Sequence, residues 1–163
     1  MSKTPEPTKI AIRPPKMIAN GGVEDARWTL VFDDEVTPGP AQAVPLLRWL
    51  ELKSHGALHP DVGVILEGSD DINTLEPYAD SIPVIALHIP KFTDGRCYSH
   101  AYRLKRVWRY TGPLLAFGDV LRDQLIYMSR CGIDTFYMRE DQDLDASLAS
   151  FGLYQGFYQY NHL

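Results

Sequence analysis

The residues best suited to chemistry lie in two short polar stretches in the second half of the chain. Asp94, Gly95 and Arg96 follow one another directly, and Asp119 belongs to the second stretch. The guanidinium of Arg96 is a planar fork that fits a carboxylate, a phosphate or another oxyanion. Gly95 lets the backbone approach a ligand closely or adopt a positive φ. We therefore predict that Asp94, Gly95, Arg96 and Asp119 bind a ligand, with a small anion as the candidate.

Asp119 and Asp123 are the candidate catalytic residues. They are four positions apart, so they would share one face of a helix, and a carboxylate pair can move protons when burial separates the two pKa values. Structural interpretations stay open beside these. Asp94 and Arg96 could form a turn with an ion pair, and Asp119 could cap a helix by accepting a hydrogen bond from the backbone of Leu121 or Arg122.

The cysteines and histidines offer weaker candidates. Cys97 lies at an expected helix N-terminus, which favours a thiolate, so it is the better candidate for a reactive thiol, although we expect a packing role. Cys131 precedes a helix-ending glycine, and we expect it to be buried and inert. His55 and His59 have metal-like spacing, but a glycine and a proline interrupt the helix there. We therefore predict no metal site.

Apolar runs and amphipathic segments alternate along the chain, which is the pattern of an α/β fold. About five βα units would form a parallel sheet, either doubly wound or half-barrel-like, because five units are too few for a closed eight-unit barrel. A short helix or irregular crossover is expected at 70–79. The strands are expected at 28–32, 62–66, 83–89, 113–117 and 134–138, and the main helices at 41–55, from Asp94 or Ser99 to about 110, at 120–130 and around 144–151.

The domain organisation follows from the same pattern. We predict one α/β domain over residues 25–163, preceded by an extended, Pro- and Gly-rich N-terminal arm over residues 1–24. The aromatic segment 154–160 could add a final strand. A half-barrel leaves a sheet edge that the arm or a second subunit must cover, so we also expect a homo-oligomer.

Ligands bind at the carboxyl ends of the strands in parallel α/β folds. The loops that follow the predicted strands carry Asp94, Arg96 and Asp119, with Asp123 one turn further on. The loops at the opposite ends carry His55, His59 and Cys131. We therefore expect Asp94, Arg96 and Asp119 to meet at one edge of the sheet, with the other three residues at the far edge.

Composition and the absence of known motifs argue against several classes of function. A net charge of −5 argues against general nucleic-acid binding, which depends on Lys and Arg. The sequence has no apolar run long enough for a membrane span, and residues 1–9 show no apolar signal core, so we expect a cytoplasmic protein without membrane contact. It also has no dinucleotide fingerprint, phosphate-binding loop or cluster-ligand set, and the cofactor, if one is used, stays unknown.

Three spaced blocks stand out in the second half of the chain: Phe92-x-Asp94-Gly95-Arg96-x-Tyr98-Ser99-x-Ala101-x-x-Leu104, Gly118-Asp119-Val120-Leu121-x-Asp123-Gln124 and Arg130-Cys131-Gly132-Ile133-Asp134-x-Phe136. In this order they resemble a bacterial family known as the domain-of-unknown-function family 934. The resemblance covers about residues 60–140. It implies an accessory protein or oxidoreductase component of assimilatory sulfite reduction, with sulfite reductase as a partner, and it supplies no catalytic residues.

Two alternatives stay open beside this role. The chain could be a stand-alone small enzyme on an anionic or sulfur-containing metabolite, with Arg96 holding the anion and Asp119 or Asp123 moving protons. It could also be a non-catalytic interaction module that dimerises through an open sheet edge and its aromatic tail.

Overall fold

The computed structural model describes residues 11–152, in which nine strands form one mixed sheet. The strand order is β1-β4-β5-β6-β7-β8-β9-β2-β3. The strands are β1 (Ala11–Ile12), β2 (Lys16–Ala19), β3 (Gly22–Asp25), β4 (Thr29–Val31), β5 (Gln42–Pro45), β6 (Val62–Leu66), β7 (Ile85–Ile89), β8 (Leu114–Gly118) and β9 (Thr135–Phe136).

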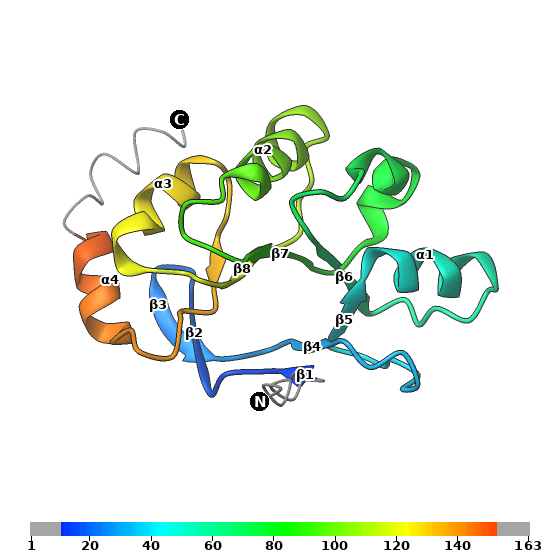
Figure 1. The fold of residues 1–163 in the computed structure, drawn as a ribbon, viewed down its shortest axis with the longest axis horizontal. Helices are drawn as coiled ribbons and strands as arrows, with labels where there is room; N and C mark the ends of the chain where they lie inside the picture. Colours follow the sequence, from blue (N-terminus) through cyan, green and yellow to red (C-terminus); the bar gives the residue numbers. More distant parts are fainter. Residues whose placement is uncertain (1–10, 153–163) are drawn as a thin grey trace, which may run out of the picture.

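Strands β4 to β9 are parallel and stand in chain order, and this order decides between the two predicted architectures. A doubly wound sheet needs a point where the strand order reverses, and strands β4 to β9 have none, so that alternative is wrong. The curled, half-barrel-like arrangement is the one observed (Figure 1). The prediction of a purely parallel sheet is also wrong, because β1, β2 and β3 pair in antiparallel fashion.

The helices lie on the outer side of the curved sheet (Figure 1). An apolar layer separates them from the strands, and a second apolar layer fills the inside of the curve. The helices are α1 (Leu46–Ser54), the 3₁₀ segment η1 (Ile72–Ser81), α2 (Arg96–Tyr102), the π-helical turn η2 (Arg103–Val107), the 3₁₀ turn η3 (Arg122–Gln124), α3 (Leu125–Arg130) and α4 (Leu144–Gly152).

Strand β8 shows how one strand serves both layers. Successive side chains of a strand point to opposite faces, and Leu114 and Ala116 belong to the outer layer while Leu115 and Phe117 belong to the inner one. Both layers are apolar, which explains why the sequence reads as a continuous apolar run with no alternation.

The N-terminal segment closes the open side of the curve. Strand β1 pairs with β4 at one edge of the sheet, whereas β2 pairs with β9 at the other. Only residues 13–15 connect these two strands. The structure describes residues 11–24 of the predicted arm and places them in the sheet, with Met17 and Ile18 buried. The aromatic segment 154–160 lies outside the described residues.

The segment predicted as a helix over 41–55 begins as a strand. Residues 42–45 form β5, which pairs with both β4 and β6, and α1 starts only at Leu46. Pro45 stands at the helix boundary, where a missing N–H is tolerated. A strand of four residues carries too little sequence pattern to be recognised beside a longer helical pattern. Only the pairing with β4 and β6 identifies residues 42–45 as a strand.

Candidate functional site

The carboxyl ends of the parallel strands meet at one edge of the half-barrel, which we call the mouth. Ile89 is paired with Gly118 at the ends of β7 and β8, and the N–H of Asp119 donates to the carbonyl of Ile89 at 2.7 Å. The loops that carry Asp94 and Asp119 therefore begin side by side. The prediction that Asp94, Arg96 and Asp119 share an edge is confirmed, but the expected meeting of Asp119 with Arg96 is not observed in the described residues.

The opposite edge holds the residues predicted to lie there. His55 ends α1 and Cys131 ends α3, and both elements lead into the starts of strands. His59 accepts a hydrogen bond from the N–H of Asp61 in the same loop. These three residues are thus remote from the mouth.

Asp94 and Arg96 bind each other. Nε and Nη2 of Arg96 lie 3.1 and 2.8 Å from the two carboxylate oxygens of Asp94, and Oδ1 also accepts from the N–H of Arg96 at 3.1 Å. These hydrogen bonds hold the pKa of Asp94 at about 2. Gly95 occupies the N-cap position of α2. Nη1 of Arg96 makes no hydrogen bond within residues 11–152, and the side chain is 59% exposed, so Arg96 keeps a donor for a ligand.

Asp119 has different partners. Its Oδ2 accepts from the N–H of Phe92 at 2.7 Å, and its Oδ1 accepts from Nη1 of Arg139 at 2.6 Å. Arg139 also donates from Nε and Nη2 to Asp141. Asp119 therefore joins the loop after β7 to the segment after β9. In the described part of the chain it shares no hydrogen bond with Arg96, and it does not cap the helical turn that follows it.

Asp123 lies apart from Asp119. Its side chain is 93% exposed, and its recorded ion partner is the adjacent Arg122 at 4.0 Å. The Asp119 side chain is only 17% exposed and is held by Arg139. The two candidate catalytic carboxylates therefore do not form a buried pair.

A carboxylate–imidazole pair that the sequence reasoning missed lies inside the mouth. Nδ1 of His88 lies 2.7 and 2.9 Å from the two carboxylate oxygens of Glu67. The His88 ring stacks on Phe117, with centroids 4.8 Å apart and planes 12° from parallel. All three side chains come from neighbouring strands β6, β7 and β8 or from the residue that follows one of them. We call Glu67 and His88 the dyad.

The sequence carries a signal that could have found the dyad. His88 stands two positions after Ala86, and Glu67 stands two positions after Ile65, and both of these apolar residues face the inner layer. Leu66 pairs with Leu87 in the parallel register of β6 and β7, so the next residue of each strand follows alongside. Strand periodicity predicts the common face, but only the register brings the two side chains together.

The N-terminus of α2 packs against the dyad. Arg96 covers Gly68, where an added Cβ would lie only 2.6 Å from the Cβ of Arg96. The thiol of Cys97 donates to the carbonyl of His88 at 3.1 Å. Burial, followed by the charges of Glu67 and Asp94, raises the pKa of Cys97 to about 12. Cys97 therefore stays a protonated, buried donor at neutral pH, which fits the expected packing role.

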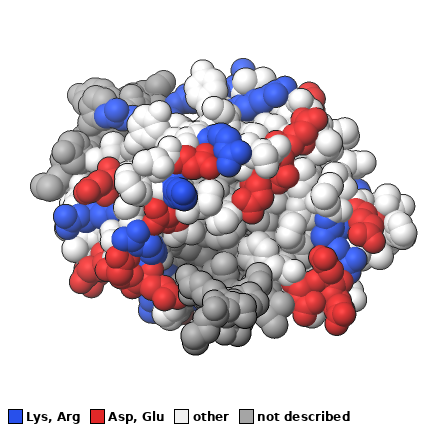
Figure 2. All heavy atoms as spheres, in the orientation of Figure 1, with Lys and Arg blue, Asp and Glu red and all other residues white. Residues whose placement is uncertain are grey.

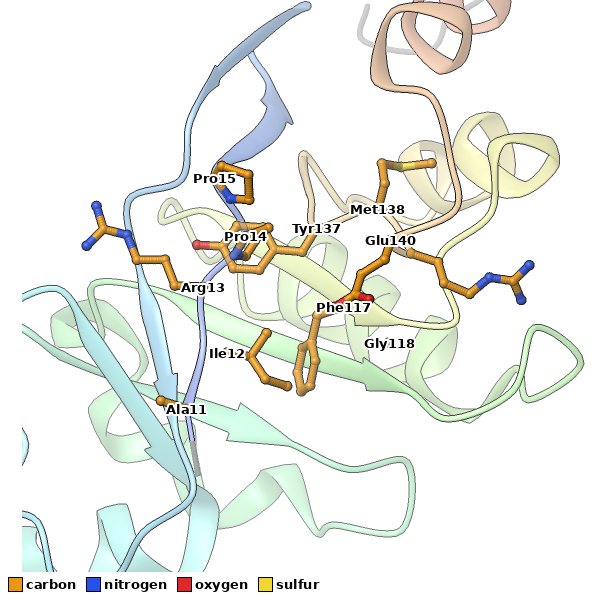
Figure 3. A pocket seen from close by; sticks show the side chains of 11 residues that line it. Ala11, Ile12, Arg13, Pro14, Pro15, Phe117, Gly118, Tyr137, Met138 and Glu140 are labelled. Carbon is orange, nitrogen blue, oxygen red and sulfur yellow. The ribbon is translucent and has the colours of Figure 1, made fainter. Parts of the chain in front are cut away.

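A pocket of about 700 Å³ opens beside the dyad. Figure 3 shows the side chains of Ile12 and Phe117 facing each other across it, and Arg13 pointing away from Phe117. The lining combines apolar side chains with exposed charged residues and comprises Ala11, Ile12, Arg13, Pro14, Pro15, Phe117, Gly118, Tyr137, Met138, Arg139 and Glu140.

The pocket and the dyad share a wall. Phe117, which carries the stacked His88 ring, lines the pocket. Gly118 also lines it, and a Cβ added there would lie 3.0 Å from Cδ2 of His88.

The face seen in Figure 2 carries acidic and basic side chains interspersed, with no field of one sign. A charged ligand on this face would be recognised by individual charged side chains and not by a broad patch of one charge.

The described residues contain neither a metal-binding cluster nor a membrane-spanning helix. Between residues 11 and 152, no group of three or more His, Cys, Asp or Glu side chains is placed to hold a metal ion. In the same range, no helix combines the length and the apolar character that crossing a membrane requires.

Comparison with known proteins gives a family match over the larger part of the chain. The profile of a family described as "Bacterial protein of unknown function (DUF934)" matches residues 63–162. The chain belongs to this family. No curated protein and no solved structure matches the chain.

The DUF934 match confirms the family resemblance and extends it from about residue 140 to residue 162. It includes the dyad, the pair of Asp94 with Arg96, and the pair of Asp119 with Arg139. Strands β1 to β5 precede it, and with them Ile12 and Arg13 of the pocket. One wall of the pocket therefore comes from the DUF934 region and the other from the N-terminal segment.

Proposed function

We propose that the protein binds a small organic anion at the mouth of its half-barrel and acts as an accessory of assimilatory sulfite reduction. The pocket between Phe117 and the N-terminal segment carries this proposal. Its volume of about 700 Å³ suits a small molecule, and it lies at the carboxyl ends of β8 and β9, where folds of this kind bind ligands.

The lining favours a ligand that is partly apolar and negatively charged. Ile12, Phe117 and Tyr137 offer apolar surface for a short carbon skeleton. Arg13 of the lining has no carboxylate within ion-pair distance in residues 11–152. Arg96 does not line the pocket, but it lies at the same edge of the sheet, and its Nη1 makes no hydrogen bond in that range. Guanidinium groups recognise carboxylates and sulfonates through paired N–H donors. The role in sulfite reduction, with sulfite reductase as the partner, rests on the family resemblance.

Filling the pocket should abolish ligand binding. We expect Ile12→Trp to weaken the binding of sulfite, of short alkyl sulfonates or of sulfur-containing carboxylates by about tenfold or more, because an indole would occupy apolar volume that the ligand needs. Isothermal titration calorimetry measures the affinity. Leu47→Trp is the matched control, since Leu47 is 79% exposed on the outer helix α1.

Two arginine variants test the charge requirement in the same titrations. Arg13→Gln and Arg96→Gln should each weaken binding several-fold, while Arg103→Gln on the outer surface should leave it unchanged. If Ile12→Trp bound every anion as tightly as the unmodified protein, the pocket would not be the binding site.

Growth on different sulfur sources tests the process. Deleting the gene should prevent growth on sulfate and on sulfite, and sulfide should restore it, because sulfide enters metabolism after the reduction step. The Ile12→Trp gene should fail to complement, and the Leu47→Trp gene should complement fully. Normal growth of the deletion strain on all three sources would exclude the sulfite-reduction role.

A further inference from the structure

We propose that the dyad is a proton-transfer site, with His88 as the catalytic base and acid and Glu67 as a positioning residue. The substrate class is a small 2-oxo carboxylic acid that carries an acidic C–H beside its carbonyl. The inference deepens the proposed function and rests on it, because the same pocket would hold the substrate. On this proposal the protein is an enzyme as well as a binding protein.

The contacts of His88 fix which nitrogen is available. An ionised carboxylate only accepts hydrogen bonds, so Nδ1 of His88 must carry the proton that Glu67 accepts. The other nitrogen, Nε2, is then the basic one. It has no hydrogen-bond partner among residues 11–152, and it is not one of the polar atoms found buried and unpaired. Nε2 is therefore open to a ligand.

The His88 ring packs against the wall of the pocket, although His88 is not itself a lining residue. The ring lies flat on Phe117, and Cδ2, the carbon bonded to Nε2, adjoins Gly118. Both residues line the pocket. Stacking on one side and the carboxylate at Nδ1 hold the ring in a single orientation. Such a held imidazole is the usual arrangement for general acid–base catalysis.

The partial exposure of the dyad argues against a purely structural role. The side chains of His88 and Glu67 are 31% and 45% exposed. Ion pairs exposed to this degree contribute little to stability, because water screens them. The dyad also lies beside a pocket at the carboxyl ends of strands, where folds of this kind keep their catalytic groups. Variants of both residues should therefore remain folded.

The proton transfer is balanced without a further reactant. The C–H bond beside the carbonyl breaks, its proton moves to Nε2 of His88, and the electron pair moves onto the carbonyl oxygen as an enolate. The proton then returns from Nε2 to the carbon or to the enolate oxygen. Arg96, which packs over Gly68 next to Glu67, supplies positive charge at the mouth. Nothing is oxidised or reduced overall.

Deuterium exchange tests the proposal directly. Pyruvate, 2-oxobutanoate and 3-mercaptopyruvate are incubated with the full chain in D₂O, and loss of the C3 proton signal is followed by NMR against a protein-free blank. We expect exchange above background for at least one compound. His88→Gln should reduce its rate by about 100-fold or more while leaving the dissociation constant within about twofold. His55→Gln, at the opposite edge, should exchange normally.

Glu67 variants separate positioning from simple folding. Glu67→Gln should slow exchange by about tenfold, because the imidazole then loses the carboxylate that orients it. Glu67→Asp should restore part of the rate. Circular dichroism checks that every variant is folded. A Glu67→Gln variant that exchanges at the unmodified rate, or a Glu67→Asp variant that recovers none of the lost rate, would overturn the positioning role.

The experiments distinguish failure of the binding proposal from failure of the dyad proposal. If calorimetry shows that one of the three acids binds and Ile12→Trp abolishes that binding, but the bound acid does not exchange, the dyad proposal is overturned and the binding proposal stands. If His88→Gln exchanges at the unmodified rate, His88 is not the base. If none of the three acids binds or exchanges, both the dyad proposal and its substrate class fail.

Discussion

Replacing Gly118 with alanine should lower the free energy of unfolding by about 3 kcal/mol. Gly118 ends β8 with φ at +101°, a conformation that side chains with a Cβ rarely adopt. An added Cβ would also collide with the carbonyl oxygen of Ile89 in the neighbouring strand β7, and that strand cannot move without disturbing the register of both strands. Urea denaturation followed by circular dichroism measures the change.

Gly39→Ala is the matched control for this substitution. Gly39 does not have a positive φ, and an added Cβ there would have no atom within 4 Å. Its free energy of unfolding should therefore stay within about 0.5 kcal/mol of the unmodified value. Equal stability of the two variants would show that the backbone at Gly118 relaxes without cost.

Cys97 should react with iodoacetamide about 1,000-fold more slowly in the folded protein than in the unfolded chain at pH 8. The thiolate is the reactive form, and burial followed by the charges of Glu67 and Asp94 raises the pKa of this thiol from 9.0 to about 12. The rate should rise about tenfold for each pH unit up to that pKa, because the thiolate fraction does so. Mass spectrometry of the labelled peptides gives the rate.

Cys131 serves as the internal reference for the labelling. It is a free thiol that is only partly buried, at the edge opposite the mouth, so it should be labelled first in the folded protein. In 8 M urea the two cysteines should react at similar rates. Labelling of Cys97 as fast as Cys131 in the folded state would contradict both the burial of Cys97 and its hydrogen bond to the carbonyl of His88.

The sequence by itself determined the class of the fold and the edge of the sheet at which the candidate site lies. Continuous apolar runs such as 62–66 and 114–117 predict strands buried on both faces, and amphipathic segments between them predict the covering helices. These patterns are local, because each strand and helix buries its own apolar face. The same reasoning placed Asp94, Arg96 and Asp119 at the carboxyl ends of the strands, and it placed His55 and Cys131 away from them.

The tertiary structure decided which side chains meet. Asp94 binds Arg96 two residues away, a contact that sequence proximity suggested, whereas Asp119 binds Arg139, twenty residues further along the chain. The second pairing depends on β8 and β9 being neighbours. Strand order and register arise from hydrogen bonds and packing between distant segments, and a single sequence does not encode them in any local pattern.

The dyad and the pocket depend on the same long-range pairing. Glu67 and His88 are twenty-one residues apart and meet because β6 and β7 pair with Leu66 beside Leu87. The pocket exists because residues 11–19 return to pair with β4 and β9, which brings Ile12 opposite Phe117. The sequence determined which chemical groups are present and at which edge of the sheet Asp94, Arg96 and Asp119 lie. The closure of the sheet determined which side chains form the dyad and the pocket.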